Sequence, residues 1–236
     1  MNWLVTTRRR LRRALGYALL GWIAVTACMV LVLRWLPPPT TSFILQNRFE
    51  AWRTGYGFYP YPYQWVDYER IAPVMALAAV AAEDQNFRQH HGVDLSGIRR
   101  AIRDNQYRDR PRGASTITQQ TAKNLFLWRD QTLVRKGVEL YFTGLLELLW
   151  PKRRILETYL NVAQFGSSVF GVEAAARTYF NRPAAELTRE QAALLAAVLP
   201  SPSLLHVDAP SEYLRHRQRW VLNQMSRLGP GYLQDL

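Results

Sequence analysis

A run of 20 residues without a charged side chain, from Ala14 to Leu33, constrains this chain more than any other feature. At a helical rise of ~1.5 Å per residue the run spans about 30 Å, the thickness of the hydrocarbon core of a bilayer. Five arginines precede it, and no acidic residue occurs before Glu50. By the positive-inside rule, this asymmetry predicts a basic cytoplasmic tail at 1–13, a transmembrane helix at 14–34 and an outward-facing remainder.

A cleaved lipoprotein signal is the alternative to an uncleaved anchor. The segment that ends at Cys28 (Val-Thr-Ala-Cys) resembles such a signal, but the apolar run continues from Met29 to Leu33. A mature lipoprotein is expected to turn polar at that point, and signal peptides usually have shorter apolar stretches. The uncleaved anchor is therefore the favoured interpretation. Because Cys28 is the only cysteine, it also excludes an internal disulfide.

The chain is strongly basic, with 30 Lys and Arg against 18 Asp and Glu and a formal charge of +12. Without the five N-terminal arginines the remainder still carries +7. This charge favours an anionic partner, such as a nucleic acid, an acidic membrane surface or a phosphorylated substrate. The predicted outward topology makes a nucleic acid the least favoured of the three.

The residues after the anchor divide into a linker and a helical domain. Three prolines at 37–39 and the proline- and aromatic-rich segment 55–66 predict a linker over 35–66, which lies near the head groups or packs on the domain. From Ile71 onward the patterns are helical, and strand-type alternation is nearly absent. Residues 72–82 are apolar all round, as in a buried helix. We therefore expect a mainly α domain at 67–230.

Glu83 and Asp84 are the first candidates for chemistry, because two carboxylates end an otherwise apolar helix. The negative end of the helix dipole and partial burial would both raise a carboxylate pKa, as a general base requires. The alternative is that the pair only solubilises a helix end. Adjacent His90 and His91 with Asp94 do not form a metal-ligand pattern, so a structural role is expected for them.

A second candidate is the segment 113–124, GASTITQQTAKN. Ser115 or Thr116 caps a helix whose N-terminus offers free N–H groups to an anion. Along that helix, residues four apart form a polar, cationic face, which suits a diphosphate and sugar hydroxyls. An ordinary solvated face remains the alternative. The members of this face are Gln119 with Lys123 and Gln120 with Asn124.

A third candidate is the polar stripe on the apolar segment 135–149, whose polar residues recur every four positions. Arg135 and Lys136 lie one turn before Glu139, within reach of its carboxylate. Two neighbouring cations keep such a carboxylate ionised and can also hold phosphate. A surface stripe with one salt bridge is the alternative. Residues 152–161, with Tyr159 on their apolar face, are interpreted as scaffold.

Taken in order, these segments resemble the peptidoglycan glycosyltransferases of glycosyltransferase family 51. The resemblance covers roughly residues 65–230. The sequence contains none of the Ser-x-x-Lys, Ser-Asp-Asn and Lys-Thr-Gly signatures of a penicillin-binding domain, as expected for a monofunctional Gram-negative member of the family. The matching stretches are residues 83–94, 113–120 with 123–124, 135–139, 152–161 and 171–180.

The resemblance implies a mainly α, lysozyme-like domain with a small membrane-associated lobe, preceded by one N-terminal transmembrane helix. Apolar residues 125–128 are the expected membrane contact, with core packing as the alternative. The implied location is the bacterial inner membrane, with the N-terminus in the cytoplasm and the catalytic domain in the periplasm.

The resemblance further implies transfer of a growing lipid-linked glycan onto the GlcNAc 4-hydroxyl of lipid II. Undecaprenyl diphosphate is released, and inversion gives a β-1,4 bond. In this scheme Glu83 matches the general base and Glu139 the second essential carboxylate, which orients the cations or helps to bind a divalent ion.

The remaining implied roles concern substrate binding. Lys123, Arg135 and Lys136 would hold the diphosphate. Ser115, Gln120 and Asn124 would position phosphate or sugar, and Asp84 is grouped with these substrate-binding residues. No metal ligands are assigned and no cofactor is required, although Mg²⁺ or Mn²⁺ at the diphosphate stays open.

The expected partners are lipid II, lipid-linked glycan, the membrane and other cell-wall synthesis proteins, without nucleic acid. A lysozyme-like lytic transglycosylase or muramidase is the nearest alternative function. A hydrolase, however, has no need of a phosphate-binding cationic face. A non-catalytic cell-wall scaffold is the other alternative, and the intact carboxylates and cations argue against it.

Overall fold

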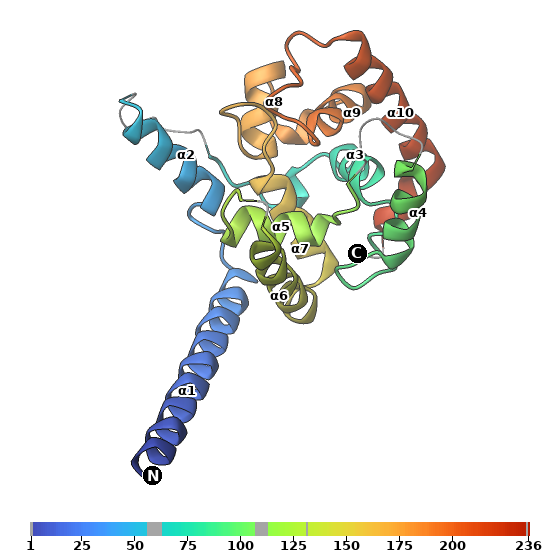
Figure 1. Ribbon diagram of the computed structural model, residues 1–236. Coiled ribbons are helices and arrows are strands. Elements are labelled where there is room, and N and C mark those ends of the chain that lie inside the picture. The colour runs from blue at the N-terminus through green and yellow to red at the C-terminus, as the bar shows by residue number, and fades with distance from the viewer. Residues whose placement is uncertain (1, 56–62, 107–112, 131, 235) are drawn as a thin grey trace. The chain divides into compact units, whose positions relative to one another are not determined.

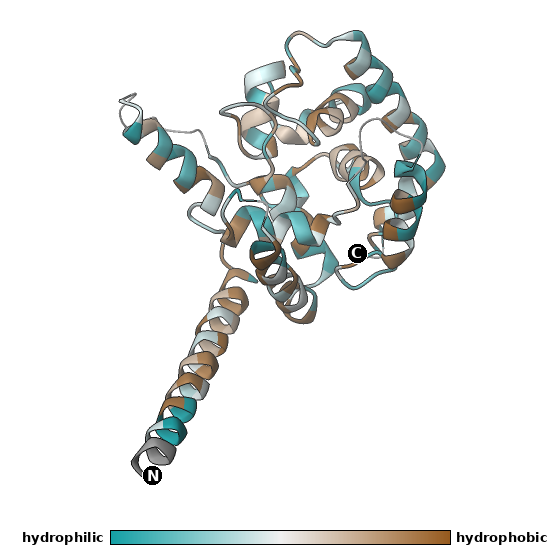
Figure 2. Cartoon of the chain, in the orientation of Figure 1, coloured by the Kyte–Doolittle hydropathy of each residue, from teal (hydrophilic) through white to brown (hydrophobic). Residues whose placement is uncertain are grey.

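The computed structural model describes residues 2–55, 63–106, 113–130, 132–234 and 236. The chain forms two compact units, Met1–Pro37 and Pro38–Leu236. The first contains one helix, α1 (Asn2–Leu33). Its colouring in Figure 2 changes from hydrophilic over the arginines to mostly hydrophobic beyond them. Among the described residues, only its stretch Thr7–Leu33 is long and apolar enough to cross a membrane.

The second unit consists of short helices, labelled in Figure 1. The described residues form no sheet, and their one β-bridge joins Gln164 to Phe170. The predicted mainly α fold is therefore confirmed. The α-helices are α2 (Ser42–Arg53), α3 (Pro73–Glu83), α4 (Leu95–Asn105), α5 (Ile117–Phe126), α6 (Leu133–Leu149), α7 (Lys152–Val162), α8 (Val172–Phe180), α9 (Arg189–Val198) and α10 (Glu212–Leu228), and the 3₁₀ turns are η1 (Tyr68–Arg70), η2 (Ala184–Glu186) and η3 (Pro230–Leu233).

Helix α3 is the centre of this unit, and it packs against α7, α9 and α10. All its residues from Met75 to Ala82 are buried, which confirms the buried helix expected from the sequence. Its alanines let the neighbouring helices approach closely. As a result, the polar end of α3 is carried into the interior rather than to an outer surface.

The helix boundaries near the site follow from local capping. Asp94 accepts a hydrogen bond from the Gly97 N–H at the start of α4. Thr116, one of the two expected caps, forms a capping box with Gln119 at the start of α5, each side chain accepting a hydrogen bond from the other residue's backbone N–H. Because Gln119 is used in this way and is buried, it does not belong to the polar face that the sequence predicted.

The segment 35–66, treated as a linker from the sequence, contains helix α2. Thr41 caps this helix, and its side chains bind the chain after α5: Ser42 Oγ and Gln46 Nε2 both donate to the Leu127 carbonyl, at 2.8 and 3.0 Å. Ile44 is fully buried. The aromatic run within 56–62 lies outside the described residues.

The apolar segment 125–128 follows the core-packing alternative for most of its length. Leu125 and Leu127 are buried, and the Phe126 ring stacks on Phe142 with centroids 4.5 Å apart. Trp128, at 42% exposure, is the member that faces solvent. Trp128 is therefore the residue of this segment most open to the predicted membrane contact.

Candidate functional site

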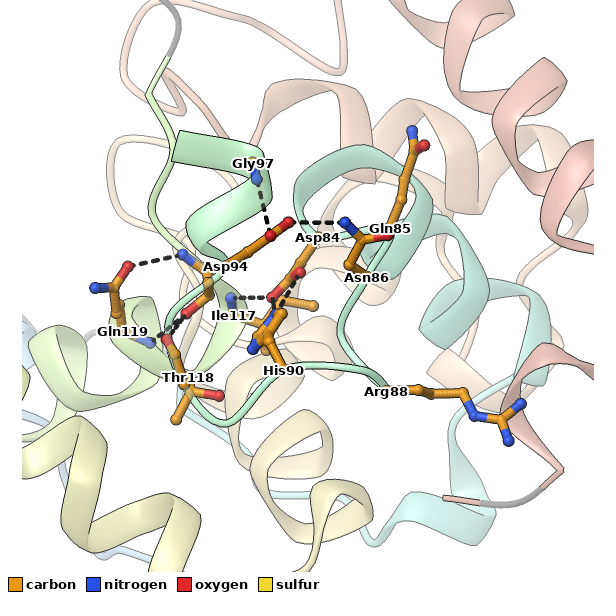
Figure 3. A network of polar contacts seen from close by, with 12 residues as sticks. Asp84, Gln85, Asn86, Arg88, His90, Asp94, Gly97, Ile117, Thr118 and Gln119 are labelled. Carbon is orange, nitrogen blue, oxygen red and sulfur yellow. Dashed lines mark hydrogen bonds and ion pairs between the residues drawn. The ribbon is translucent and has the colours of Figure 1, made fainter. Parts of the chain in front are cut away.

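Asp84 anchors the end of α3 to its surroundings. It is 6% exposed, and both of its oxygens lie close to His90 Nε2, at 2.8 and 3.0 Å. Its Oδ2 also accepts a hydrogen bond of 2.9 Å from the Ile117 N–H, the first residue of α5. Figure 3 shows the carboxylate between these two partners. Since a helix N-terminus attracts negative charge, this contact fixes α3 against α5.

The two adjacent histidines lie in different environments. His90 is buried beside Asp84, whereas His91 is exposed. Among the described residues, no three His, Cys, Asp or Glu side chains are grouped as a metal ion requires. The contact of His90 with Asp84 agrees with the structural role expected for it.

Glu83 lies beside Asp84 in sequence but has different contacts. Its Oε2 accepts a hydrogen bond of 2.8 Å from Gln120 Nε2, and its Oε1 lies 3.6 Å from Arg217 Nη2. A donated hydrogen bond and a nearby cation both stabilise negative charge on a carboxylate. The Glu83 side chain is 12% exposed.

Glu83 also lines a cleft of about 270 Å³, which we call the Glu83 cleft. Its walls come from the end of α3, from α4, from residues 113–116 and from α10. Ser115 lines it as well, while the neighbouring Thr116 serves as the cap of α5. Glu83 therefore contacts Gln120 and Arg217 and also lines this cleft.

A buried tyrosine, Tyr159, orients the side chain of Gln120. The Tyr159 hydroxyl donates to Gln120 Oε1 at 3.4 Å, which leaves the Gln120 amide nitrogen directed at Glu83. Burial, followed by the negative charges of Glu83 and Asp84, raises the pKa of Tyr159 well above its ordinary value, so its proton stays in place. The sequence assigned Tyr159 to the scaffold, and that assignment missed its contact with the site.

Glu139 is held by two cations, as its spacing from them predicted. Its Oε2 binds Arg135 Nη1 at 2.6 Å, and its Oε1 contacts Lys136 Nζ. Glu139 is 2% exposed, and Arg135 is also buried. Both carboxylate oxygens are therefore occupied, and the open-surface alternative for this stripe does not apply at Glu139.

Lys123 belongs to the same group of charges. Burial is the main reason that its pKa is lowered, and repulsion from Arg135 and Lys136 acts in the same direction, partly offset by Glu139 and Glu83. A cation that is destabilised in this way gains most from an anionic ligand. We refer to Lys123, Arg135 and Lys136 as the cation cluster.

The structure thus brings most of the predicted site residues into two neighbouring groups. Glu83, Gln120 and Ser115 lie at the cleft, and Glu139 lies with the cation cluster. Asp84 and Asn124 are buried. Sequence reasoning missed Arg217, which lies 134 positions after Glu83 and whose Nε donates to the Ala197 carbonyl at 3.0 Å. No local pattern in α10 indicated this long-range contact.

Comparison with known proteins places the chain among transglycosylases. The sequence model of the transglycosylase family matches residues 57–226. The biosynthetic peptidoglycan transglycosylase of Mannheimia succiniciproducens is 45% identical over 228 residues, which cover 97% of this chain and 93% of that protein. The proteins of the same name from Yersinia pestis (strain Pestoides F) and Yersinia pseudotuberculosis (strain IP32953) are each 49% identical over 211 residues, which cover 89% of this chain and 88% of theirs.

Proposed function

Because this chain belongs to the transglycosylase family, we propose that it polymerises the glycan strands of peptidoglycan from a lipid-linked precursor. The single observation that carries the chemical part of the proposal is the position of Glu83. Its carboxylate lines a cleft and is hydrogen-bonded to Gln120, on the helix that carries Lys123.

The reaction that fits this arrangement is one direct displacement. Glu83 accepts the proton of the acceptor's GlcNAc 4-hydroxyl, and the oxygen forms a bond to the anomeric carbon of the donor glycan. The bond between that carbon and the diphosphate breaks, and undecaprenyl diphosphate leaves with the electron pair. Attack opposite an α-linked leaving group gives the β-1,4 product.

The cation cluster stabilises the departing diphosphate. Charge-assisted hydrogen bonds to phosphate oxygens are strongest where water is excluded, and Lys123 and Arg135 are both largely buried. Glu139 holds Arg135 and Lys136 in place and keeps their mutual repulsion from separating them. In this assignment Glu139 positions the cations, and Asp84 positions Glu83 rather than touching substrate.

A divalent cation fits poorly at Glu139, because both of its oxygens already contact cationic side chains. The cation cluster itself supplies positive charge at the diphosphate. We therefore expect no cofactor to be required. Polymerisation by protein treated with a chelator checks this, and complete loss of activity that Mg²⁺ or Mn²⁺ restores would contradict it.

We place the protein in the bacterial inner membrane, spanning it once through α1. The five arginines ahead of the apolar run favour a cytoplasmic N-terminus and a periplasmic catalytic unit. Its partners are then lipid II, lipid-linked glycan and other cell-wall synthesis proteins rather than nucleic acid. Reporter fusions after Leu33 and at the C-terminus test this topology, and activity of both reporters on the cytoplasmic side would overturn it.

The deciding experiment for the function uses the purified full chain in detergent with labelled lipid II. The proposal predicts consumption of lipid II and growth of a glycan polymer. The same protein is also incubated with isolated cell wall, because a lytic transglycosylase or muramidase would cleave it. Cleavage of cell wall without consumption of lipid II would replace the proposal with the hydrolytic alternative.

A further inference from the structure

The chain turns at the end of α10, and the turn brings η3 against the end of α3. Gly229 follows α10 with a φ of 76°, a positive value that glycine adopts readily. The 3₁₀ turn η3 then packs against both α10 and α3. The match to the family's sequence model ends at residue 226, so η3 lies beyond the part of the chain that the model describes. It nevertheless contacts the loop that follows Glu83.

Tyr232, in η3, binds this loop through the loop's backbone. Its hydroxyl donates to the Gln85 carbonyl at 2.9 Å and accepts from the Arg88 N–H at 3.4 Å. Arg88 Nη1 donates in turn to the Tyr232 carbonyl at 3.0 Å, and its guanidinium carbon lies 5.5 Å from the centre of the Tyr232 ring. Figure 3 shows the Arg88 side chain directed away from Asp84. One tyrosine therefore holds two residues of the loop.

The Tyr232 hydroxyl keeps the proton that it donates. Burial is the main reason that the pKa of Tyr232 is raised above its ordinary value, and the negative charge of Asp84 acts in the same direction. The hydrogen bond from the Arg88 N–H and the charge of Arg88 offset this rise in part. The bond to the Gln85 carbonyl is therefore present throughout the neutral range.

Gln85 closes the end of α3. Its Nε2 donates to the Ala81 carbonyl at 3.1 Å, one of the carbonyls that a helix end commonly leaves without a helical partner. The same nitrogen donates to Gln224 Oε1, on α10, at 3.3 Å. Gln224 thus holds the side chain of Gln85, and Tyr232 holds its backbone. Because the last turn of α3 carries Glu83, the position of Glu83 depends on how firmly Gln85 is held.

A base requires a more accurate position than folding alone does. Glu83 must come within hydrogen-bond reach of the proton that it accepts. A misplacement of about 1 Å can cost roughly 100-fold in rate. The loop after α3 can therefore affect the reaction without contacting substrate, through the direction in which it holds the end of the helix.

We propose that Tyr232 is a positioning residue for the reaction, because it holds Gln85 and Arg88 and thereby fixes the end of α3 that presents Glu83 to the acceptor hydroxyl. This inference rests on the proposed function and gives the segment after residue 226 a part in it. Tyr232 does not line the Glu83 cleft. Its loss should therefore slow the reaction and leave substrate binding nearly unchanged.

The test separates positioning from folding. The full chain is compared with Tyr232→Phe, which removes only the hydroxyl, with Arg88→Ala and with the double variant. Tyr213→Phe is the matched control, because it removes the same atom from an exposed tyrosine at the start of α10. The kcat and KM for polymerisation of lipid II are measured together with Tm. Single-turnover rates are also compared for Glu83→Gln with and without Tyr232→Phe.

We expect kcat to fall roughly 5- to 10-fold in Tyr232→Phe, as for the loss of one hydrogen bond, with KM and Tm nearly unchanged. Arg88→Ala should also lower kcat. The double variant should lose less than the product of the two single effects, because both residues act through one contact. In the Glu83→Gln background Tyr232→Phe should have no effect, because no base remains to be positioned. Tyr213→Phe should behave as the unaltered chain.

Two results would overturn the proposal. The first is an unchanged kcat in Tyr232→Phe. The second is an equal proportional loss of rate with Glu83 and with Glu83→Gln, because such a loss comes from the folded state as a whole rather than from the position of the base. Absence of product with the unaltered chain would instead reject the proposed function.

Discussion

Glu83 and Glu139 flank the same cation cluster, but their surroundings differ. Glu139 is 2% exposed, and each of its oxygens contacts a cationic side chain of its own helix. Glu83 accepts a hydrogen bond from the Gln120 amide, lies 3.6 Å from Arg217 Nη2 of another helix, and lines the Glu83 cleft. Glu139 is thus enclosed by cations of its own helix, whereas Glu83 lines a cleft, as the proposed base requires. Their shared charge does not imply a shared role.

The largest effect on stability is expected for Glu139→Gln. The change leaves the buried Arg135 without its counter-charge, which typically costs about 3–5 kcal/mol. For a unit of this size the expected fall in Tm is on the order of 10 °C, measured by thermal unfolding, together with loss of polymerisation. Glu69→Gln is the matched control, because its pair with Arg153 is exposed and should contribute little. A Glu139→Gln protein as stable as the unaltered chain would show that Glu139 does not have the structural role that distinguishes it from Glu83.

Lys123→Ala tests the positive charge that interacts with both Glu83 and Glu139. Loss of a charge-assisted hydrogen bond to the diphosphate should weaken lipid II binding roughly 10- to 100-fold. Lys123→Arg keeps the charge and should retain most of the affinity. Burial lowers the Lys123 pKa, so the lysine loses its charge at a lower pH than an ordinary lysine as the pH rises. Its contribution to lipid II binding should be lost at that point, whereas that of the arginine variant should persist. Equal affinity for lipid II in all three proteins would show that Lys123 does not bind the diphosphate.

Asp84→Asn distinguishes a positioning role from a substrate contact. The variant keeps the size of the side chain but removes the charge that His90 and the Ile117 N–H stabilise. We expect a loss of about 1–3 kcal/mol in unfolding free energy, with a decrease in kcat and little change in KM. A raised KM for lipid II at unchanged stability would instead make Asp84 a substrate-binding residue.

The smallest effect is the pH dependence of Asp94. Burial alone would raise the pKa of this carboxyl, but hydrogen bonds from Ser96, the Gly97 N–H and Asn86, with the charge of Arg100, together lower it from 3.8 to about 2. A lowered folded-state pKa contributes stability above the ordinary value, and that contribution is lost as the pH falls through the folded-state value. The Tm difference between the unaltered chain and Asp94→Asn should therefore be constant near neutral pH and shrink between pH 3.8 and about 2. A constant difference down to pH 2 would contradict this.

The features that were predictable from the sequence are those set within one helix turn or one cap. The contacts of Arg135 and Lys136 with Glu139 follow from helical spacing, and the capping box at Thr116 follows from a four-residue pattern. The buried character of α3 follows from its composition. In each case the physical cause lies within a few residues of its effect.

The features that were not predictable join distant parts of the chain. Arg217 reaches Glu83 only because α10 packs on α3, and Tyr159 reaches Gln120 only because α7 packs on α5. Gln119 has the spacing of a polar surface residue but is drawn inward by its own capping box. Helical periodicity identifies a face but not the element that covers it.

The most direct test of the central claim is a single-turnover measurement with Glu83→Gln, in which donor and acceptor are both saturating so that binding drops out. We predict a protein with unchanged Tm that binds lipid II but forms product at least ~10³-fold more slowly, within the range attributed to general-base catalysis. Product formation at the unaltered rate by this folded variant would show that another group accepts the proton. The different roles proposed for Glu83 and Glu139 would then be contradicted.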